Sequence, residues 1–176
     1  MNLLIHKLNK NAIIPKYATE KSACFDIHAC LDINSKIKAY ESQDFPYMVE
    51  NKEKSTTLKY TEKYGLIIQP NTRALIPTGL SFCIPNNHSI RLHPRSGLSF
   101  KNGIVLANCE GVIDEDYVEE VFVPIYNISN KEFMVKNGDR ICQAELVLDH
   151  RVKIIETYNK INKKSDRIGG FGSTGK

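Results

Sequence analysis

Residues 65–93 read GLIIQPNTRALIPTGLSFCIPNNHSIRLH, and this stretch decides the class of fold. Short runs rich in Ile, Leu and Phe alternate with the turn signals Pro70-Asn71 and Pro85-Asn86-Asn87. Apolar runs that are bounded by Pro, Gly and Asn in this way are typical of β-strands. We therefore predict strands at residues 65–69, 73–77, 80–84 and 89–93, the last two at hairpin distance.

The same pattern continues on both sides of this stretch. Further strands are predicted at residues 3–8, 104–107, 121–128, 133–135 and 140–148, with Asn137-Gly138 as a turn. No segment keeps a helical period over three turns, and a short helix around residues 97–102 is the most that we expect. Many short, closely spaced strands indicate an all-β fold, either a barrel or a sandwich.

Composition limits the class of protein. The chain has 176 residues with 41% hydrophobic and 25% charged residues, as in an ordinary single globular domain. Its net charge of +4 is mild and scattered, so stable nucleic-acid binding is not expected. No signal peptide or apolar run of roughly 18 residues is present, so we expect no membrane association. The location expected is cytoplasmic, or nuclear for a eukaryotic or viral source.

The cysteines indicate a reducing compartment. Their number, five, is odd, and no pair has C-x-x-C spacing. We therefore expect buried, structural thiols, and neither a disulfide framework nor a zinc site.

The chain divides into a barrel domain and a tail. We expect the barrel at residues 1–158, with a polar insertion at about residues 40–62 that forms a loop or an exposed hairpin. Residues 159–176 begin as a charged linker and end in the Gly-rich sequence RIGGFGSTGK. Taken alone, this composition indicates a frayed terminus.

Two segments carry groups suited to chemistry. The sequence PRSG at residues 94–97 offers a guanidinium, a hydroxyl and a glycine N–H within one turn, a combination that suits phosphate oxygens. Taken alone, it indicates an ordinary turn with a surface arginine more strongly. The sequence NCEGVIDEDY at residues 108–117 suits a hairpin that presents backbone groups to a base edge, and equally a charged hairpin tip. Its three close carboxylates repel, so at least one must be solvated or hydrogen-bonded.

Five segments in order resemble the motifs of the trimeric dUTPase family. They are SACFDIHA (22–29), PRSGLSFKNGI (94–104), NCEGVIDEDY (108–117, extending to Asn127), GDRICQ (138–143) and RIGGFGSTG (167–175). The resemblance implies a distorted, jelly-roll-like β-barrel that forms a homotrimer with active sites shared between subunits. It implies hydrolysis of dUTP to dUMP and pyrophosphate, which limits uracil in DNA and supplies dUMP for dTMP synthesis.

The resemblance also implies roles for individual residues. Asp114 would deprotonate the water that attacks the α-phosphorus, and Mg²⁺ would neutralise the charge of the leaving group. Asp26 would contact the water shell of that ion. The phosphates would be held by Arg95, Ser96, Gly97 and Gln143.

Selectivity would come from the third motif and the tail. Asn108 and the backbone of Gly111, Val112 and Ile113 would read the uracil edge, and Tyr117 would leave no room for a 2′-hydroxyl. The tail would close over the substrate as a lid, and its contacts with the substrate would be made by Arg167, Phe171, Gly172, Ser173 and Thr174.

The sequence departs from the family pattern in four places. Cys24 stands where the first motif usually has Gly, and Val118-Glu119 stands where Arg-Gly usually follows the tyrosine. Arg167 lies one residue closer to Phe171 than usual, and the insertion at residues 40–62 is not typical.

Three alternatives remain. A dCTP deaminase shares the fold, but it needs a glutamate where Pro124 stands. A dUTP-binding regulatory protein with weak activity would accommodate the unusual Val118-Glu119. An all-β structural domain would require five coincidental motifs.

Overall fold

The computed structural model describes residues 1–33, 35–41 and 54–166. Short strands dominate this part of the chain, and they are joined by one short helix. The elements are β1 (Leu4–Lys7), β2 (Phe25–His28), β3 (Lys36–Glu41), β4 (Lys54–Lys59), β5 (Leu66–Ile68), β6 (Thr72–Pro77), β7 (Leu80–Cys83), β8 (His88–His93), α1 (Ser96–Asn102), β9 (Ile104–Leu106), β10 (Gly111–Ile113), β11 (Phe122–Asn127), β12 (Phe133–Val135) and β13 (Arg140–Leu148). The all-β prediction is confirmed, as is the short helix near residue 97.

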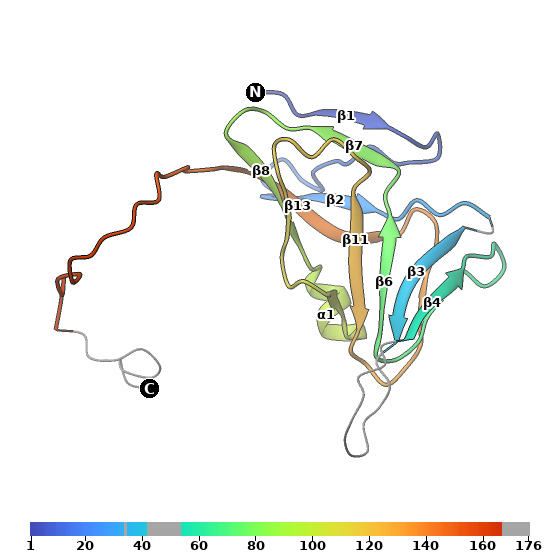
Figure 1. Cartoon of the computed structure of the whole chain (residues 1–176). Helices are drawn as coiled ribbons and strands as arrows, with labels where there is room; N and C mark the ends of the chain where they lie inside the picture. The colour runs from blue at the N-terminus through green and yellow to red at the C-terminus, as the bar shows by residue number, and fades with distance from the viewer. Residues whose placement is uncertain (34, 42–53, 167–176) are drawn as a thin grey trace, which may run out of the picture.

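The strands form a distorted barrel of two main sheets. One has the order β4-β3-β6-β11-β9 and the other the order β10-β8-β13-β2, while β1-β7 and β12-β5 are two-stranded pairs. Figure 1 shows β6 and β11 side by side near the centre of the molecule, with α1 below β8. Strands adjacent in a sheet are therefore often distant in the sequence.

Alternating side chains build the core between the sheets. In β11 the burial alternates regularly, and Val123 and Ile125 point inward with Ile76 of β6. The four-stranded sheet contributes Ile27 and Ile90, which are 0% exposed. Complete burial of each such side chain stabilises the fold by roughly 1.5–3 kcal/mol.

The hairpin expected between the segments at 80–84 and 89–93 does not form. β7 pairs with β1, whereas β8 lies between β10 and β13 in the other sheet. The turn at Pro85-Asn86-Asn87 sends the chain from one layer to another, because Asn87 takes a left-handed conformation with φ 60°. The carbonyl of Asn87 accepts a hydrogen bond from the Asp149 N–H, which fixes this crossing.

The strands β2 and β10 were not predicted, and β3 and β4 were not predicted as strands, although they pair at the segment where a loop or an exposed hairpin was expected. β3 does alternate, with Ile37 and Ala39 buried, but its lysines obscured the pattern. β3 and β4 form an antiparallel pair from Lys36↔Lys59 to Glu41↔Lys54. β4 and the last residues of β3 fall within the segment interpreted as an insertion, whose residues 42–53 lie outside the described part.

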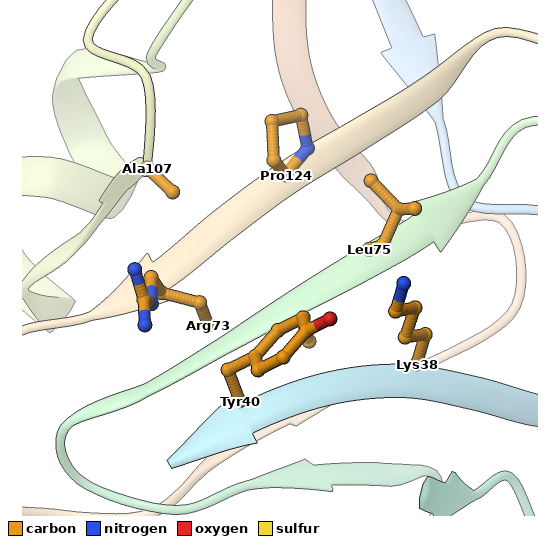
Figure 2. A pocket seen from close by; sticks show the side chains of 7 residues that line it. Lys38, Tyr40, Arg73, Leu75, Ala107 and Pro124 are labelled. Carbon is orange, nitrogen blue, oxygen red and sulfur yellow. The ribbon is translucent and has the colours of Figure 1, made fainter. Parts of the chain in front are cut away.

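A hollow lies on the outer face of the five-stranded sheet (Figure 2). Its volume is about 270 Å³, and the Tyr40 ring lies between two cations, with Lys38 Nζ at 5.5 Å and Arg73 Cζ at 5.9 Å from its centre. Pro124 forms part of its wall. None of the site residues expected from the sequence lines this hollow.

Residues 149–166 run away from the barrel as an arm (Figure 1). The arm forms no helix or strand, and it starts at residue 149, nine residues before the expected barrel boundary at 158. Its apolar side chains are exposed, among them Ile154 at 93% and Tyr158 at 92%. In the parts of the chain that the structure describes, no helix is long and apolar enough to cross a membrane.

Candidate active site

A buried carboxylate between two arginines lies at the centre of the first candidate region. Asp26 of β2 has a side chain only 8% exposed, and its Oδ1 is 3.3 Å from Arg95 Nε. Its Oδ2 accepts a hydrogen bond from Arg140 Nη1 at 3.1 Å. The two guanidiniums carry the opposite charge, so they offset the free-energy cost of burying this carboxylate. We call Asp26, Arg95 and Arg140 the arginine–aspartate cluster.

Arg140 was not expected at the site. Asp139, its neighbour in the sequence, instead accepts the Lys136 N–H with its carboxylate at 2.7 Å. A register shift between Arg140 and Cys142 interrupts the pairing of β13 with β2 at this point. Arg95 Nη1 also donates to the Arg140 carbonyl at 3.3 Å. A single sequence does not reveal this pairing, because Asp26 and Arg140 meet only through β2–β13 pairing.

Helix α1 presents the second motif. Arg95 is the residue before the helix and has an extended backbone, while Ser96 and Gly97 form its exposed first turn. The first N–H groups of any helix lack partners within the helix, so they are available to an external acceptor. A Cβ placed on Gly97 would meet nothing within 4 Å, so the packing of this chain does not require glycine there.

Gln143 lies beside the arginine–aspartate cluster. On β13 it is opposite Asp26 of β2 on one side and His93 of β8 on the other. A cavity of about 270 Å³ opens next to the cluster, and its walls include Arg95, Arg140 and Phe133. The cluster, Gln143 and the start of α1 therefore form one continuous cationic region.

The second candidate region is the segment that carries Asp114, which we call the Asp114 hairpin (residues 108–117). β10 lies at the edge of its sheet and pairs with β8, with Gly111 opposite Leu92. A Cβ on Gly111 would lie 3.0 Å from the Leu92 Cβ, so a larger residue here would require Leu92 to shift by a few tenths of an ångström. Val112 is 48% exposed and Ile113 is buried, as expected for a strand with one face in the core.

Asp114 follows β10 and is exposed to solvent. A turn closes after it, with the Tyr117 N–H donating to the Asp114 carbonyl at 3.1 Å and the Tyr117 hydroxyl donating to the Glu120 carbonyl at 2.8 Å. Asn108 is also exposed, and its carbonyl accepts the Glu110 N–H. The side chains of Asp114 and Asn108 thus face water.

Glu115 anchors the Asp114 hairpin. Its carboxylate accepts the Asn87 N–H at 2.8 Å and a hydrogen bond from Arg151 at 3.1 Å. Of the three adjacent carboxylates, Glu115 is thus the one bound to donors, while Asp114 and Asp116 are solvated. This arrangement agrees with the expectation that the three charges cannot all be left uncompensated.

Asp114 and Arg95 lie at opposite ends of β8. Ile113 is opposite Ile90 near the start of that strand, whereas Arg95 follows its end. Six strand residues span roughly 20 Å at about 3.3 Å each. Asp114 and Arg95 of one chain therefore do not line the same pocket.

The expected tail residues Arg167, Phe171, Gly172, Ser173 and Thr174 lie outside the described residues. Asn127, the end of the third motif, is 0% exposed and structural. Its amide donates to the carbonyls of Ile68 and Lys131, and its Oδ1 accepts two hydrogen bonds from Ser129.

Comparison with known proteins gives consistent matches. A family model described as dUTPase matches residues 43–175. The deoxyuridine 5'-triphosphate nucleotidohydrolase of Nautilia profundicola is 36% identical over 176 residues, which cover 100% of both chains. Staphylococcus bacteriophage 80alpha dUTPase, solved with dUPNHPP, has a TM-score of 0.66 at 20% identity, over 99% of this chain and 98% of that chain. A mutant dUTPase from phage phi11 of S. aureus, solved with a structural Mg(II) ion, has a TM-score of 0.62 at 17% identity and covers 90% of this chain and 98% of that chain.

Proposed function

The chain belongs to the dUTPase family, and we infer from this membership that it hydrolyses dUTP to dUMP and pyrophosphate. The observation that carries this inference is the relationship of 36% identity over the full length of a deoxyuridine 5'-triphosphate nucleotidohydrolase. Residues of the four motifs within the described part of the chain form the two regions above.

In the proposed reaction, Asp114 is the general base. Its carboxylate takes a proton from a water, whose oxygen then forms a bond to the α-phosphorus while the bond from that phosphorus to the bridging oxygen breaks. Pyrophosphate leaves with the electron pair of the broken bond. The exposure of Asp114 supports this role, because the attacking water must reach it.

The cationic region suits the phosphates. Arg95 can offer a forked pair of donors, Gln143 lies beside it on the sheet, and Ser96 and Gly97 add a hydroxyl and free backbone N–H groups. Asp26 offsets one of the two guanidinium charges and holds the orientation of both. The open space above Gly97 supports close approach of an anion at this turn.

Uracil recognition is proposed at the Asp114 hairpin. Among the described strands β10 has one neighbour, β8, so the backbone groups of its other edge are unpaired. Those groups, together with the amide of Asn108, can match the donors and acceptors of a uracil edge and leave cytosine mismatched. Tyr117 lies at the base of the hairpin, where we propose that it packs under the sugar.

We propose Mg²⁺ as the cofactor, carried mainly by the triphosphate. Asp26 Oδ1 is buried and accepts no hydrogen bond from the described residues, so one of its lone pairs can accept from a water of the ion's shell. Mg²⁺ usually keeps several waters and binds through one or two carboxylates and substrate phosphates, and this donor set fits that preference. The ion would neutralise charge on the leaving pyrophosphate.

We propose a homotrimer whose sites are shared between subunits. The roughly 20 Å between Asp114 and Arg95 supports this assembly, because a second copy is needed to bring the two groups to one substrate. The arm at residues 149–166 supports it as well, because its exposed apolar side chains need another surface to cover them. The lid residues from Arg167 to Thr174 would follow the arm to that neighbour.

We also propose a cytoplasmic location without stable nucleic-acid binding. All five cysteines are unpaired, which suits a reducing compartment, and the net charge is only +4.

The test is pyrophosphate release measured in parallel from dUTP, dCTP, dTTP and UTP with Mg²⁺ present. We expect rapid release from dUTP alone. Release from dCTP or UTP at a similar rate would contradict the proposed base or sugar selectivity. Binding of dUTP without release would instead favour a regulatory nucleotide-binding protein.

A further inference from the structure

We propose that Cys24, His93 and Glu145 form a binding site for a thiophilic divalent cation such as Zn²⁺. One ligand atom from each of these side chains lies within 4.8 Å of the other two. The three residues are distant in the sequence, which explains why the cysteine spacing alone gave no sign of a zinc site. None of the three is among the residues proposed for Mg²⁺ and substrate, although Gln143 is opposite His93 and Asp26 lies two residues after Cys24.

Sheet pairing brings the three side chains together. Glu145 lies on β13, the strand between β8 and β2, and two residues along β13 Gln143 is opposite His93. Ala144 is opposite Phe25, which follows Cys24 directly. The pairing of β13 with β8 on one side and β2 on the other thus brings the three side chains close together.

The histidine is already oriented. Its Nε2 is 3.0 Å from Glu145 Oε1, and its Nδ1 is 3.7 Å from Glu110 Oε1. When one imidazole nitrogen binds a metal, the other commonly donates to a carboxylate, which sets the tautomer and the ring angle. Glu110 is placed to accept in this way when Nε2 turns to an ion.

The donor set suits zinc. A thiolate, an imidazole and a carboxylate are ligands that Zn²⁺ takes in tetrahedral sites, with a fourth position left for water. Bond lengths near 2.0–2.3 Å place such ligand atoms about 3.3–3.8 Å apart, so the present spacing needs only small side-chain rotations. Sulfur and nitrogen donors also discriminate against Mg²⁺, which prefers oxygen.

Cys24 can ligate a metal ion only after its thiol has lost its proton. Burial, followed by the charges of Glu145 and Asp26, raises the pKa of the Cys24 thiol and so disfavours loss of its proton. A divalent cation would displace that proton and offset the two carboxylates. The three side chains are partly buried, so an entering ion can still reach them.

The competing explanation is that His93 only forms ion pairs with Glu110 and Glu145. A sulfur-to-metal charge-transfer absorption distinguishes the two explanations, because the ion pairs of His93 do not involve the Cys24 sulfur. The experiment starts from full-length protein that has been treated with a chelator. Co²⁺ is titrated into it in the presence of excess Mg²⁺, and binding is measured from the sulfur-to-cobalt charge-transfer absorption. We expect saturation at about one Co²⁺ per chain, and displacement of Co²⁺ by Zn²⁺.

The variants make the test specific. Cys24→Gly should abolish the charge-transfer band while the protein still folds, because glycine is usual at this position in the family. Cys83→Ala, which removes an exposed cysteine at the end of β7, is the matched control and should keep the band. Glu110→Gln should weaken Co²⁺ binding about tenfold.

Two results would overturn the proposal. They are the absence of the band in the unmodified protein and an unchanged band in Cys24→Gly. Hydrolysis of dUTP with Mg²⁺ is measured on the same samples, so a failure of the metal site is distinguished from a failure of the proposed function.

Discussion

The arginine–aspartate cluster and the Asp114 hairpin differ in how the fold holds them. Asp26 is 8% exposed and bonded from two sides, whereas Asp114 is exposed and its side chain makes no hydrogen bond among the described residues. The proposed phosphate-binding groups are therefore fixed before substrate arrives. The proposed base sits on an edge hairpin, and in the proposed trimer a neighbouring subunit would complete its surroundings. The proposed base and the proposed phosphate-binding arginine thus lie at opposite ends of β8, and the fold holds them by different means.

The largest effect is expected for Asp114→Asn. Because the amide cannot take a proton from water, turnover of dUTP should fall about a thousandfold or more. The affinity for a non-hydrolysable dUTP analogue should stay within about threefold, because the variant keeps the size and the arginine–aspartate cluster. Steady-state pyrophosphate release and calorimetric binding measure the two quantities, and near-normal turnover would remove Asp114 from the mechanism.

Mixing two inactive variants tests the separation of the regions. Asp114→Asn and Arg95→Ala are unfolded together and refolded as mixed trimers. If each site takes these two residues from different chains, about one quarter of the sites in a random equal mixture are intact. Activity should then return to about that fraction. A mixture that stays inactive would place both residues of a site in one chain.

A smaller effect, on stability, is expected for Asp26→Asn. Removal of the carboxylate leaves Arg95 and Arg140 facing each other without compensation, although Arg140 is half exposed and solvent screens it. We expect a loss of about 2 kcal/mol in the free energy of unfolding, or a fall of roughly 4–8 °C in Tm. Thermal melts measure it, with the exposed Asp116→Asn as the control that should change Tm by no more than about 2 °C. Equal Tm values for both variants would show that the cluster is not stabilising.

The smallest effect is expected for Glu115→Gln. The amide can still accept the Asn87 N–H but loses its charge opposite Arg151, a pair worth about 1 kcal/mol or less at the surface. We expect KM for dUTP to rise about twofold to threefold with little change in kcat. A large fall in kcat would mean that Glu115 contributes to the chemistry itself.

The sequence predicted the strands whose apolar side chains alternate between turn signals. Residues 133–135 and 140–148 match β12 and β13, because Asn137-Gly138 marks the break, and Gly138 takes the expected left-handed turn with φ 83°. The sequence did not predict the partners of β7 and β8. Strand pairing across layers depends on contacts between distant residues, which local patterns do not encode.

The sequence motifs predicted which residues belong to the candidate site, but not which of them contact one another. The resemblance singled out Asp26, Arg95 and Asp114, while the ion pair of Asp26 with Arg140 arises from β2–β13 pairing. The role of Glu115 likewise depends on the turn at Asn87 reaching the Asp114 hairpin. The roles proposed for individual site residues, including those of the tail, stay predictions.

The exposed apolar arm at residues 149–166 has a consequence for how the protein matures in a cell. In the proposed homotrimer a newly made chain has to meet two others before that surface is covered, so the rate of maturation would rise steeply with concentration. At low expression, chains wait longer in a form that proteases can cut and other apolar surfaces can capture. The yield of active enzyme should therefore rise faster than the rate of synthesis, so that a modest change in transcription has a disproportionate effect on the nucleotide pool.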